Sequence, residues 1–191
     1  MKNKIKYLIL SIILICITIF FAIFAKNALN NKATLNKDND KNIIDNIINE
    51  KIDLQEAYVT KIVDGDTIWV NIDGKEEKVR FIGINCPEYT KEIEPYGKEA
   101  TEYTKQNLLN KTVYLQKDIS DTDSYDRLLR YVWTEKITEI NDENIKNYLF
   151  NYSLVYEGLA KSNYYKPDIT LQKYLEDAEK YAKESEKGMW K

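Results

Sequence analysis

Short β-branched segments separated by tight turns restrict the folds available to the part of this chain after residue 56. Residues 57–63 and 67–72 are rich in Val, Ile and Thr, and both are short enough to be single strands. Asp73 and Gly74 follow directly, and this dipeptide is a strong signal for a hairpin turn. Residues 78–84 then supply the returning strand. The pattern therefore predicts that the domain begins with paired strands.

Two more β-rich segments and three helical patterns complete this part of the chain. Gly158 suits the end of the second helix, because glycine readily adopts the conformation of a C-terminal cap. Five strands that are interrupted and followed by helices predict an α+β domain. We expect a five-stranded Greek-key barrel of the OB type, packed with about three helices. The further strands are expected at 112–116 and 128–133, and the helices at 95–109, 143–156 and 170–187.

An apolar segment precedes this domain. Residues 7–25 carry no charge, and three lysines lie before them. Their length predicts entry into a membrane, and the lysines predict a cytoplasmic N-terminus with the domain outside. Both an uncleaved anchor and a cleaved signal peptide fit the segment. We therefore expect a signal or anchor at 1–26, a polar linker that is part helical or irregular at 27–56, and an exported domain at 57–191, either secreted or anchored to the outer face of the membrane.

The composition excludes several kinds of site. The chain has no histidine, so the commonest general base and the usual zinc and copper ligand are absent. Cys16 and Cys86 are too few for a zinc cluster or a disulfide framework. From residue 57 onward, 20 Lys and Arg face 25 Asp and Glu, a net charge of −5. A polyanion would therefore have to be bound through a few local contacts.

Polar residues gather at the two turns that flank the second and third strands. Asp64 and Asp66 precede the second strand, and Asn85 and Glu88 follow the third. If these strands pair, Asp66 and Asn85 offer oxygen ligands to one cation, and backbone carbonyls can add more. Oxygen ligands without histidine or thiolate suit Ca²⁺ or Mg²⁺. The alternative is a pair of ordinary surface turns.

Arginine is rare in this lysine-rich chain, which has 25 Lys and three Arg. Arg80 lies in the strand that runs to Asn85, and Arg127 lies in a loop before the fifth strand. Arginine presents a planar fork of donors that lysine lacks, so it suits bidentate binding of phosphate. Two such cations beside a metal ion could hold a phosphodiester and stabilise its transition state. Arg130 is expected to be a solvated or barrel-rim cation.

Six motifs follow one another over about residues 57–191: VDGDT, VRFIGINCPE, PYGKEAT, SYDRLLRYVW, GLAKSNYYKP and KGMW. They resemble the motifs of the staphylococcal nuclease family and occur in that family's order. The resemblance implies an OB barrel with three helices, expected to be monomeric. It also implies Ca²⁺-dependent hydrolysis of DNA and RNA that leaves 3′-phosphate ends. The alternative is a weak or inactive domain of the same fold that binds nucleic acid or a protein partner.

The resemblance also implies catalytic and substrate-binding residues. Arg80 and Arg127 resemble the family's phosphate clamp. Glu88 resembles the residue that positions or deprotonates the attacking water. The residues that resemble the family's substrate-binding tyrosines are Tyr125, Tyr164 and Tyr165.

The metal ligands implied by the resemblance include one departure from the family pattern. Asp66 resembles a direct Ca²⁺ ligand, Cys86 a ligand through its backbone carbonyl, and Asp64 an outer-shell carboxylate. Asn85 stands where the family has an aspartate ligand. Its amide oxygen can still bind a cation, but one negative charge is lost. We therefore expect weaker Ca²⁺ binding than an aspartate would give.

Overall fold

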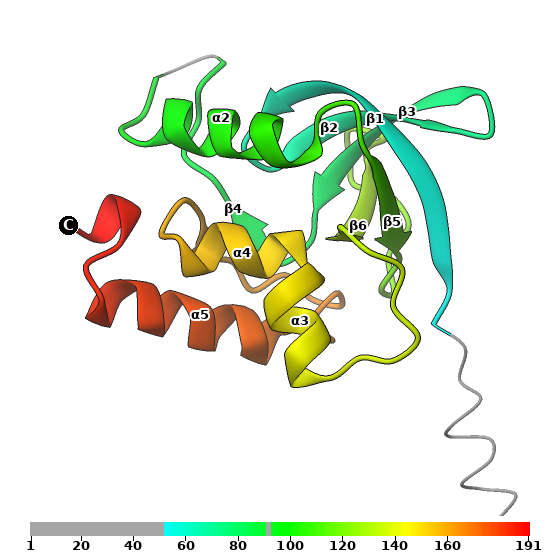
Figure 1. The fold of residues 1–191 in the computed structure, drawn as a ribbon. Coiled ribbons are helices and arrows are strands. Elements are labelled where there is room, and N and C mark those ends of the chain that lie inside the picture. Colours follow the sequence, from blue (N-terminus) through cyan, green and yellow to red (C-terminus); the bar gives the residue numbers. More distant parts are fainter. Residues whose placement is uncertain (1–51, 91–92) are drawn as a thin grey trace, which may run out of the picture. The chain divides into compact units, whose positions relative to one another are not determined.

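The computed structural model describes residues 52–90 and 93–191 (Figure 1). The apolar segment predicted to enter a membrane, at 7–25, and most of the predicted linker lie outside these residues. Within the described part of the chain, no helix has both the length and the apolar character needed to cross a membrane.

Five strands close into a barrel. They are β1 (Leu54–Asp64), β2 (Thr67–Ile72), β3 (Lys75–Phe81), β5 (Thr112–Gln116) and β6 (Leu128–Trp133). Their order around the barrel is β1-β2-β3-β6-β5, and β1 closes it by also pairing with β5. The β3–β6 pair is parallel and the other pairs are antiparallel. A second, two-stranded sheet joins β4 (Ile84–Asn85) to β7 (Lys161–Ser162).

Helices cover one side of the barrel, which gives the α+β class predicted from the sequence. Helix α2 packs on β1, while α4 packs on both α5 and β6. Figure 1 shows α4 between α2 and α5. The described helices are α2 (Gly97–Leu108), α3 (Asp142–Tyr148), α4 (Phe150–Tyr156), α5 (Gln172–Glu184) and the short 3-10 helix η1 (Gly188–Trp190).

Two predicted elements are divided in the structure. The single helix expected at 143–156 is broken at Leu149, whose backbone is extended and forms a β-bridge with Trp133. The described residues therefore form four α-helices where about three were expected, because pairing with the barrel overrides helix propensity at Leu149. The strand expected at 78–84 ends at Phe81, and a turn at Gly83 (φ 75°) separates it from β4.

The start of the barrel also differs from the expectation. Strand β1 begins at Leu54 rather than at residue 57, because Leu54 and Gln55 pair with Gln116 and Leu115 of β5. Closure of the barrel therefore uses residues that the sequence pattern placed in the linker. The predicted hairpin turn is confirmed, since Asp73 (φ 51°) and Gly74 (φ 88°) both have the left-handed backbone that such turns require.

One buried amide joins the helical layer to the barrel beneath the turn between β3 and β4. Asn151 in α4 is fully buried. Its Oδ1 accepts a hydrogen bond from the amide of Val132 in β6, at 2.9 Å. Its Nδ2 donates to the carbonyl of Ile82, also at 2.9 Å. Asn151 therefore satisfies two backbone groups that have no access to water.

Replacing this amide should destabilise the fold. Asn151→Ala leaves the Val132 amide and the Ile82 carbonyl without partners, and each loss costs about 1–3 kcal/mol. We expect the free energy of unfolding, measured by urea denaturation, to fall by about 2–5 kcal/mol. The control is Asn107→Ala, which removes one contact to the carbonyl of Tyr103 within α2 and should cost about 0.5 kcal/mol or less. Equal losses in the two variants would show that Asn151 has no special role.

Candidate active site

A cleft of about 610 Å³ opens where the turn after β1, the β3–β4 segment, the loop before β6 and the loop after β7 meet. Residues from distant parts of the sequence therefore face one space. Of the site residues predicted from the sequence, Tyr164 does not line the cleft and is 54% exposed. Those that line it are Asp64, Asp66, Arg80, Asn85, Cys86, Glu88, Tyr125, Arg127 and Tyr165.

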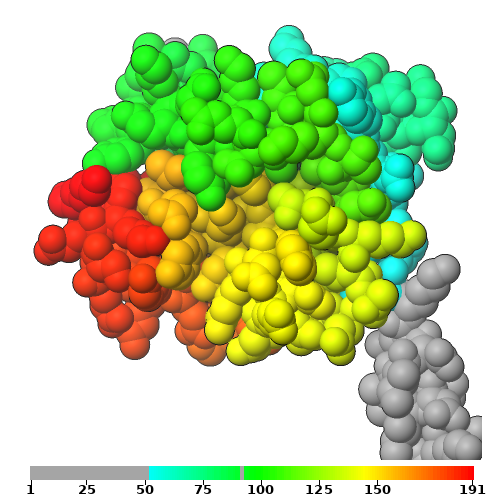
Figure 2. Space-filling model, in the orientation of Figure 1, coloured from blue at the N-terminus to red at the C-terminus, as the bar shows by residue number. Residues whose placement is uncertain are grey.

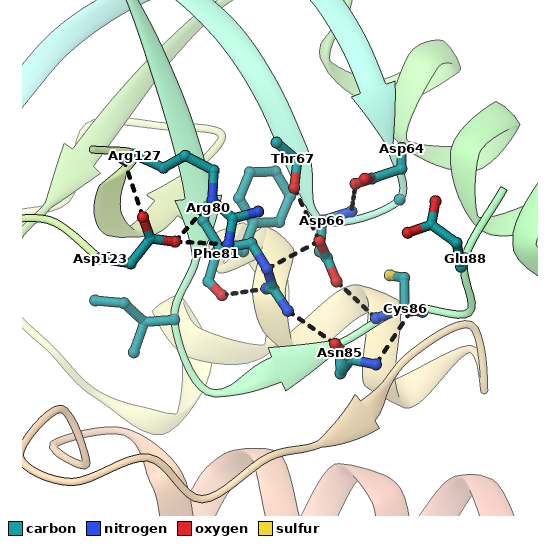
Figure 3. A network of polar contacts seen from close by, with 12 residues as sticks. Asp64, Asp66, Thr67, Arg80, Phe81, Asn85, Cys86, Glu88, Asp123 and Arg127 are labelled. Atoms are coloured by element: carbon teal, nitrogen blue, oxygen red, sulfur yellow. Dashed lines mark hydrogen bonds and ion pairs between the residues drawn. The ribbon is translucent and has the colours of Figure 1, made fainter. Parts of the chain in front are cut away.

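Asp66 is the centre of a polar network on the wall of this cleft (Figure 3). The residue is only 5% exposed. Its Oδ2 accepts a hydrogen bond from the amide of Cys86 at 2.7 Å. Its Oδ1 lies 3.1 Å from both the Thr67 hydroxyl and Arg80 Nε. A buried carboxylate is stable only with such partners, so these contacts hold Asp66 in place.

Arg80 binds Asp66 and Asn85 at the same time. Besides its ion pair with Asp66, it donates from Nη2 to Asn85 Oδ1 at 3.0 Å and from Nη1 to the carbonyl of Phe81 at 2.7 Å. Asn85 in turn donates from Nδ2 to the carbonyl of Cys86 at 3.3 Å. The three groups predicted to bind a cation are therefore joined in one network, and Arg80 occupies oxygens that a cation would also use.

The donor atoms of this network fit a hard cation. They are a carboxylate, an amide oxygen and a backbone carbonyl, which are common ligands of Ca²⁺. Among residues 52–90 and 93–191, no three acidic or cysteine side chains are grouped so that they alone could hold a metal ion. A cation here would thus depend on the neutral oxygens of Asn85 and Cys86, and on water.

The thiol of Cys86 takes no part in this chemistry. The residue is 7% exposed. Burial, followed by the charge of Asp66, raises the pKa of the thiol well above its usual value, so it stays protonated. A protonated thiol is neither a good metal ligand nor a nucleophile. In this network Cys86 takes part through its backbone, since its amide donates to Asp66 and its carbonyl accepts from Asn85.

Asp64 lies at the end of β1, next to the turn that carries Asp66. Its Oδ1 accepts a hydrogen bond from the amide of Asp66 at 3.1 Å. Burial and the neighbouring charge of Asp66 raise the pKa of Asp64 to about 6. Two carboxylates this close repel each other when both are ionised. A cation in the cleft would relieve that repulsion.

Glu88 is held by the loop that follows β4. Its Oε1 accepts hydrogen bonds from the amides of Tyr89 and Thr90, at 3.0 and 2.7 Å. Its carbonyl lies so close to the start of α2 that a Cβ on Gly97 would come within 2.4 Å of it. Glycine is therefore required at this position for the loop to pack against α2. In Figure 3 Glu88 and Arg127 lie on opposite sides of Asp66.

Arg127 is positioned by Asp123, which sequence reasoning did not identify. Arg127 donates from Nε to Asp123 Oδ2 at 2.7 Å, and Nη2 lies 2.6 Å from the same oxygen. Burial raises the pKa of Asp123, but the hydrogen bonds from Arg127 and from the amide of Tyr125 outweigh it and leave the pKa below its usual value. The ring of Tyr125 lies 5.4 Å from the guanidinium. Within residues 52–90 and 93–191, Nη1 of Arg127 has no hydrogen bond or ion pair, so it can bind a phosphate oxygen.

The loop after β7 brings Tyr165 and Lys166 to the cleft. Asp168, which is 5% exposed, anchors this loop by accepting hydrogen bonds from the amides of Ile119 and Ser120, at 2.9 and 2.7 Å. Sequence reasoning also missed Lys166 and Asp168. Asp168 contacts residues 48 and 49 positions away, so no local pattern could have identified it. Asp123 and Lys166 did carry a signal, since Asp123 lies four residues before Arg127 and Lys166 lies within the GLAKSNYYKP motif.

The raised pKa of Asp64 predicts a pH-dependent stability. In the metal-free chain the folded state keeps a proton that the unfolded state releases between about pH 4 and pH 6, so stability falls as pH rises through this window. Asp64→Asn removes this titration and keeps the acceptor for the amide of Asp66. We expect the variant to be more stable than the parent at about pH 7, by about 1–3 kcal/mol, with the gain lost below about pH 4.

The measurement is urea denaturation of both chains at several pH values, with a chelator present. Asp73→Asn makes the same chemical change at the β2–β3 turn and serves as the control. A gain that is equal for both variants, or independent of pH, would contradict the prediction.

Comparison with known proteins agrees with this geometry. The family model described as "Staphylococcal nuclease homologue" matches residues 78–191. A thermonuclease of Staphylococcus hyicus is 39% identical over 139 residues, which cover 71% of this chain and 76% of that protein. A thermonuclease of Staphylococcus intermedius is 38% identical with the same coverage. An SPbeta prophage-derived endonuclease of Bacillus subtilis is 30% identical over 72% of this chain and 45% of its own length. The chain therefore belongs to the staphylococcal nuclease family.

Proposed function

We propose that this chain is an exported, Ca²⁺-dependent nuclease that hydrolyses the phosphodiester bonds of DNA and RNA and leaves 3′-phosphate ends. As a member of its family it is a hydrolase that acts on phosphodiester bonds. The observation that carries the proposal is the network of Asp66, Arg80 and Asn85 in a cleft whose walls also present Glu88 and Arg127. If the two turns were ordinary surface turns, nothing would explain why both arginines and Glu88 line the cleft that holds this network.

The proposed mechanism assigns a task to each part of the cleft. Bound Ca²⁺ would supply positive charge that stabilises the phosphate in the transition state. Asp66, the amide oxygen of Asn85 and the carbonyl of Cys86 would hold it. Glu88 would accept a proton from the attacking water, since its carboxylate lines the same cleft.

The arginines would bind the phosphate oxygens on which charge develops. Arg127 has Nη1 available for this role, while Asp123 fixes the rest of its guanidinium. Arg80 would turn its Nη2 from Asn85 to the phosphate once a cation binds the Asn85 oxygen. Tyr125 and Tyr165 would contact the nucleotide beside the scissile phosphate. Loss of the 5′ oxygen from phosphorus would leave a 3′-phosphate on one product and a 5′-hydroxyl on the other.

Export is proposed from the N-terminal sequence. Residues 7–25 carry no charge and follow Lys2, Lys4 and Lys6, a pattern that directs the following domain across the membrane. Outside the cell Ca²⁺ reaches the millimolar range, in which extracellular sites bind it. The weaker Ca²⁺ affinity expected from a neutral ligand such as Asn85 is therefore compatible with the proposed extracellular location.

The proposed function is tested by hydrolysis of single-stranded DNA and RNA across a calcium titration. The full-length chain, purified in mild detergent, should cleave both with Ca²⁺ and neither with excess chelator. Glu88→Gln keeps an oxygen that can accept from the Thr90 amide but removes the base, so kcat should fall by about 10²–10⁴-fold. If the parent chain is folded but does not cleave at millimolar Ca²⁺, the result favours the alternative, a domain that binds nucleic acid or a protein partner without cleavage. The neutral Asn85 is the feature that supports this alternative. Mass analysis of the products checks the 3′-phosphate.

Asn85→Asp tests whether this residue binds the cation. The substitution adds a carboxylate beside Asp66, and the ligand charge count helps to set Ca²⁺ affinity. We expect roughly tenfold tighter Ca²⁺ binding, measured by isothermal titration calorimetry without substrate. Asn71→Asp adds the same charge at the β2–β3 hairpin and should leave the titration unchanged. An unaltered affinity in Asn85→Asp would show that residue 85 is not a ligand.

A further inference from the structure

A second pocket, of about 410 Å³, continues from the catalytic cleft. The two share Asn85, Pro87 and Glu94. From this boundary the catalytic cleft extends toward Tyr165 and Lys166, whereas the second pocket extends toward the C-terminal end of the chain. Its remaining lining residues are Pro95, Tyr96, Lys161, Met189 and Trp190.

Lys161 places a positive charge beside the candidate metal site. It is the β7 residue that pairs directly with Asn85 of β4. Side chains of directly paired residues lie on the same face of a sheet, with Cβ atoms about 4.5–5.5 Å apart. Lys161 is exposed, and it lines the second pocket but not the catalytic cleft. Lys161 therefore places a positive charge in the pocket next to the cleft, on the face of the sheet that also carries Asn85.

Trp190 forms an aromatic wall of the same pocket. The ammonium of Lys161 lies over its ring, 5.9 Å from the centroid. The C-terminal segment is fixed by a hydrogen bond of 3.0 Å from the amide of Met189 to the carbonyl of Gly158. Figure 2 shows these C-terminal residues (red) directly below the residues that lead into α2 (green). The aromatic wall is thus part of the folded domain.

We propose that this pocket is a second nucleotide subsite, which binds the neighbouring nucleotide of a single strand whose scissile phosphate lies in the catalytic cleft. Lys161 contacts the next phosphate, and the base and sugar lie against Trp190, Tyr96 and Pro95. The inference rests on the proposed nuclease function. It assigns to the C-terminal residues a role in substrate binding that the cleft alone does not show.

A single-stranded nucleic acid is the occupant that fits the chemistry of the pocket. Such strands are bound by grooves that combine cations for the phosphates with aromatic rings for the bases. The domain carries a net charge of −5, so a polyanion must be held by local cations such as Lys161. Glu94 lies at the boundary between the pockets, where its Oε2 accepts a hydrogen bond from the amide of Glu88 at 2.8 Å. Continuity with the cleft gives the strand one path through both.

The test compares two substrates in the full-length chain with Ca²⁺. Thymidine 5′-p-nitrophenyl phosphate has one phosphodiester and no second phosphate, whereas pentathymidylate reaches the proposed subsite. Lys161→Met removes the charge and keeps an unbranched side chain over Trp190. We expect the ratio of kcat/KM for pentathymidylate to that for the short substrate to fall about 3–10-fold. The salt dependence of pentathymidylate hydrolysis should decrease by about 0.7 in slope. A change in Ca²⁺ affinity would affect both substrates and leave the ratio unchanged.

Lys183→Met is the matched control. Lys183 also lies over the Trp190 ring, 4.5 Å from the centroid, but it does not line the pocket. Its removal should leave the ratio unchanged. A fall in the ratio of the same size in both variants would mean that the lysines act by positioning Trp190, and would overturn the phosphate contact.

A binding measurement separates this inference from the proposed function. Anisotropy of 3′-labelled pentathymidylate is followed in the Glu88→Gln chain with Ca²⁺, with and without Lys161→Met. Binding that is about 3–10-fold weaker in the Lys161→Met chain supports the subsite. This holds even if the parent cleaves neither substrate, because lack of cleavage would overturn only the proposed catalysis. Equal binding in the two chains, or an equal kcat/KM ratio, would overturn the subsite. If the parent protein still cleaves both substrates, that result leaves the proposed nuclease function standing.

Discussion

The buried carboxylate of Asp66 holds together the three segments that form the site. Through Cys86 it binds the segment after β4, through Arg80 it binds β3, and through Thr67 it fixes the start of β2. Because a buried charge without partners is very costly, the fold tolerates Asp66 only while all three segments are in place. The same contacts that stabilise the barrel at this edge therefore preorganise the oxygens for a cation.

This arrangement couples the candidate metal ligands to Arg80, the arginine proposed to bind phosphate. Arg80 donates to Asp66 Oδ1 and to Asn85 Oδ1, which are also oxygens that a cation would need. Binding of a cation by these oxygens would thus be linked to release of Arg80 Nη2 in one equilibrium. Asn85 makes the link looser than an aspartate would, since a neutral amide holds the guanidinium through a weaker hydrogen bond than a carboxylate does. The loss of one ligand charge is therefore offset in part by easier release of Arg80.

Local sequence patterns predicted the parts of the fold that local chemistry determines. The Asp73-Gly74 turn and the strands at 67–72, 112–116 and 128–133 lie where periodicity placed them. The break at Leu149 was missed, because it depends on pairing with Trp133, a residue distant in sequence. The site followed the same rule. The predicted site residues other than Tyr164 line the cleft, whereas Asp168, whose partners are 48 and 49 residues away, carried no local signal.

An acidic domain can act on a polyanion because the charges in its cleft are not independent. The carboxylates of Asp66 and Asp123 are each paired with an arginine, so they add little repulsion to an approaching phosphate. A cation bound at Asp66 would turn this wall of the cleft positive. Lys166 and Lys161 then extend the favourable region in two directions from that point. In the proposed mode of binding, substrate attraction would therefore be confined to a short track across the site, and it would depend on a few contacts rather than on the field of the whole domain.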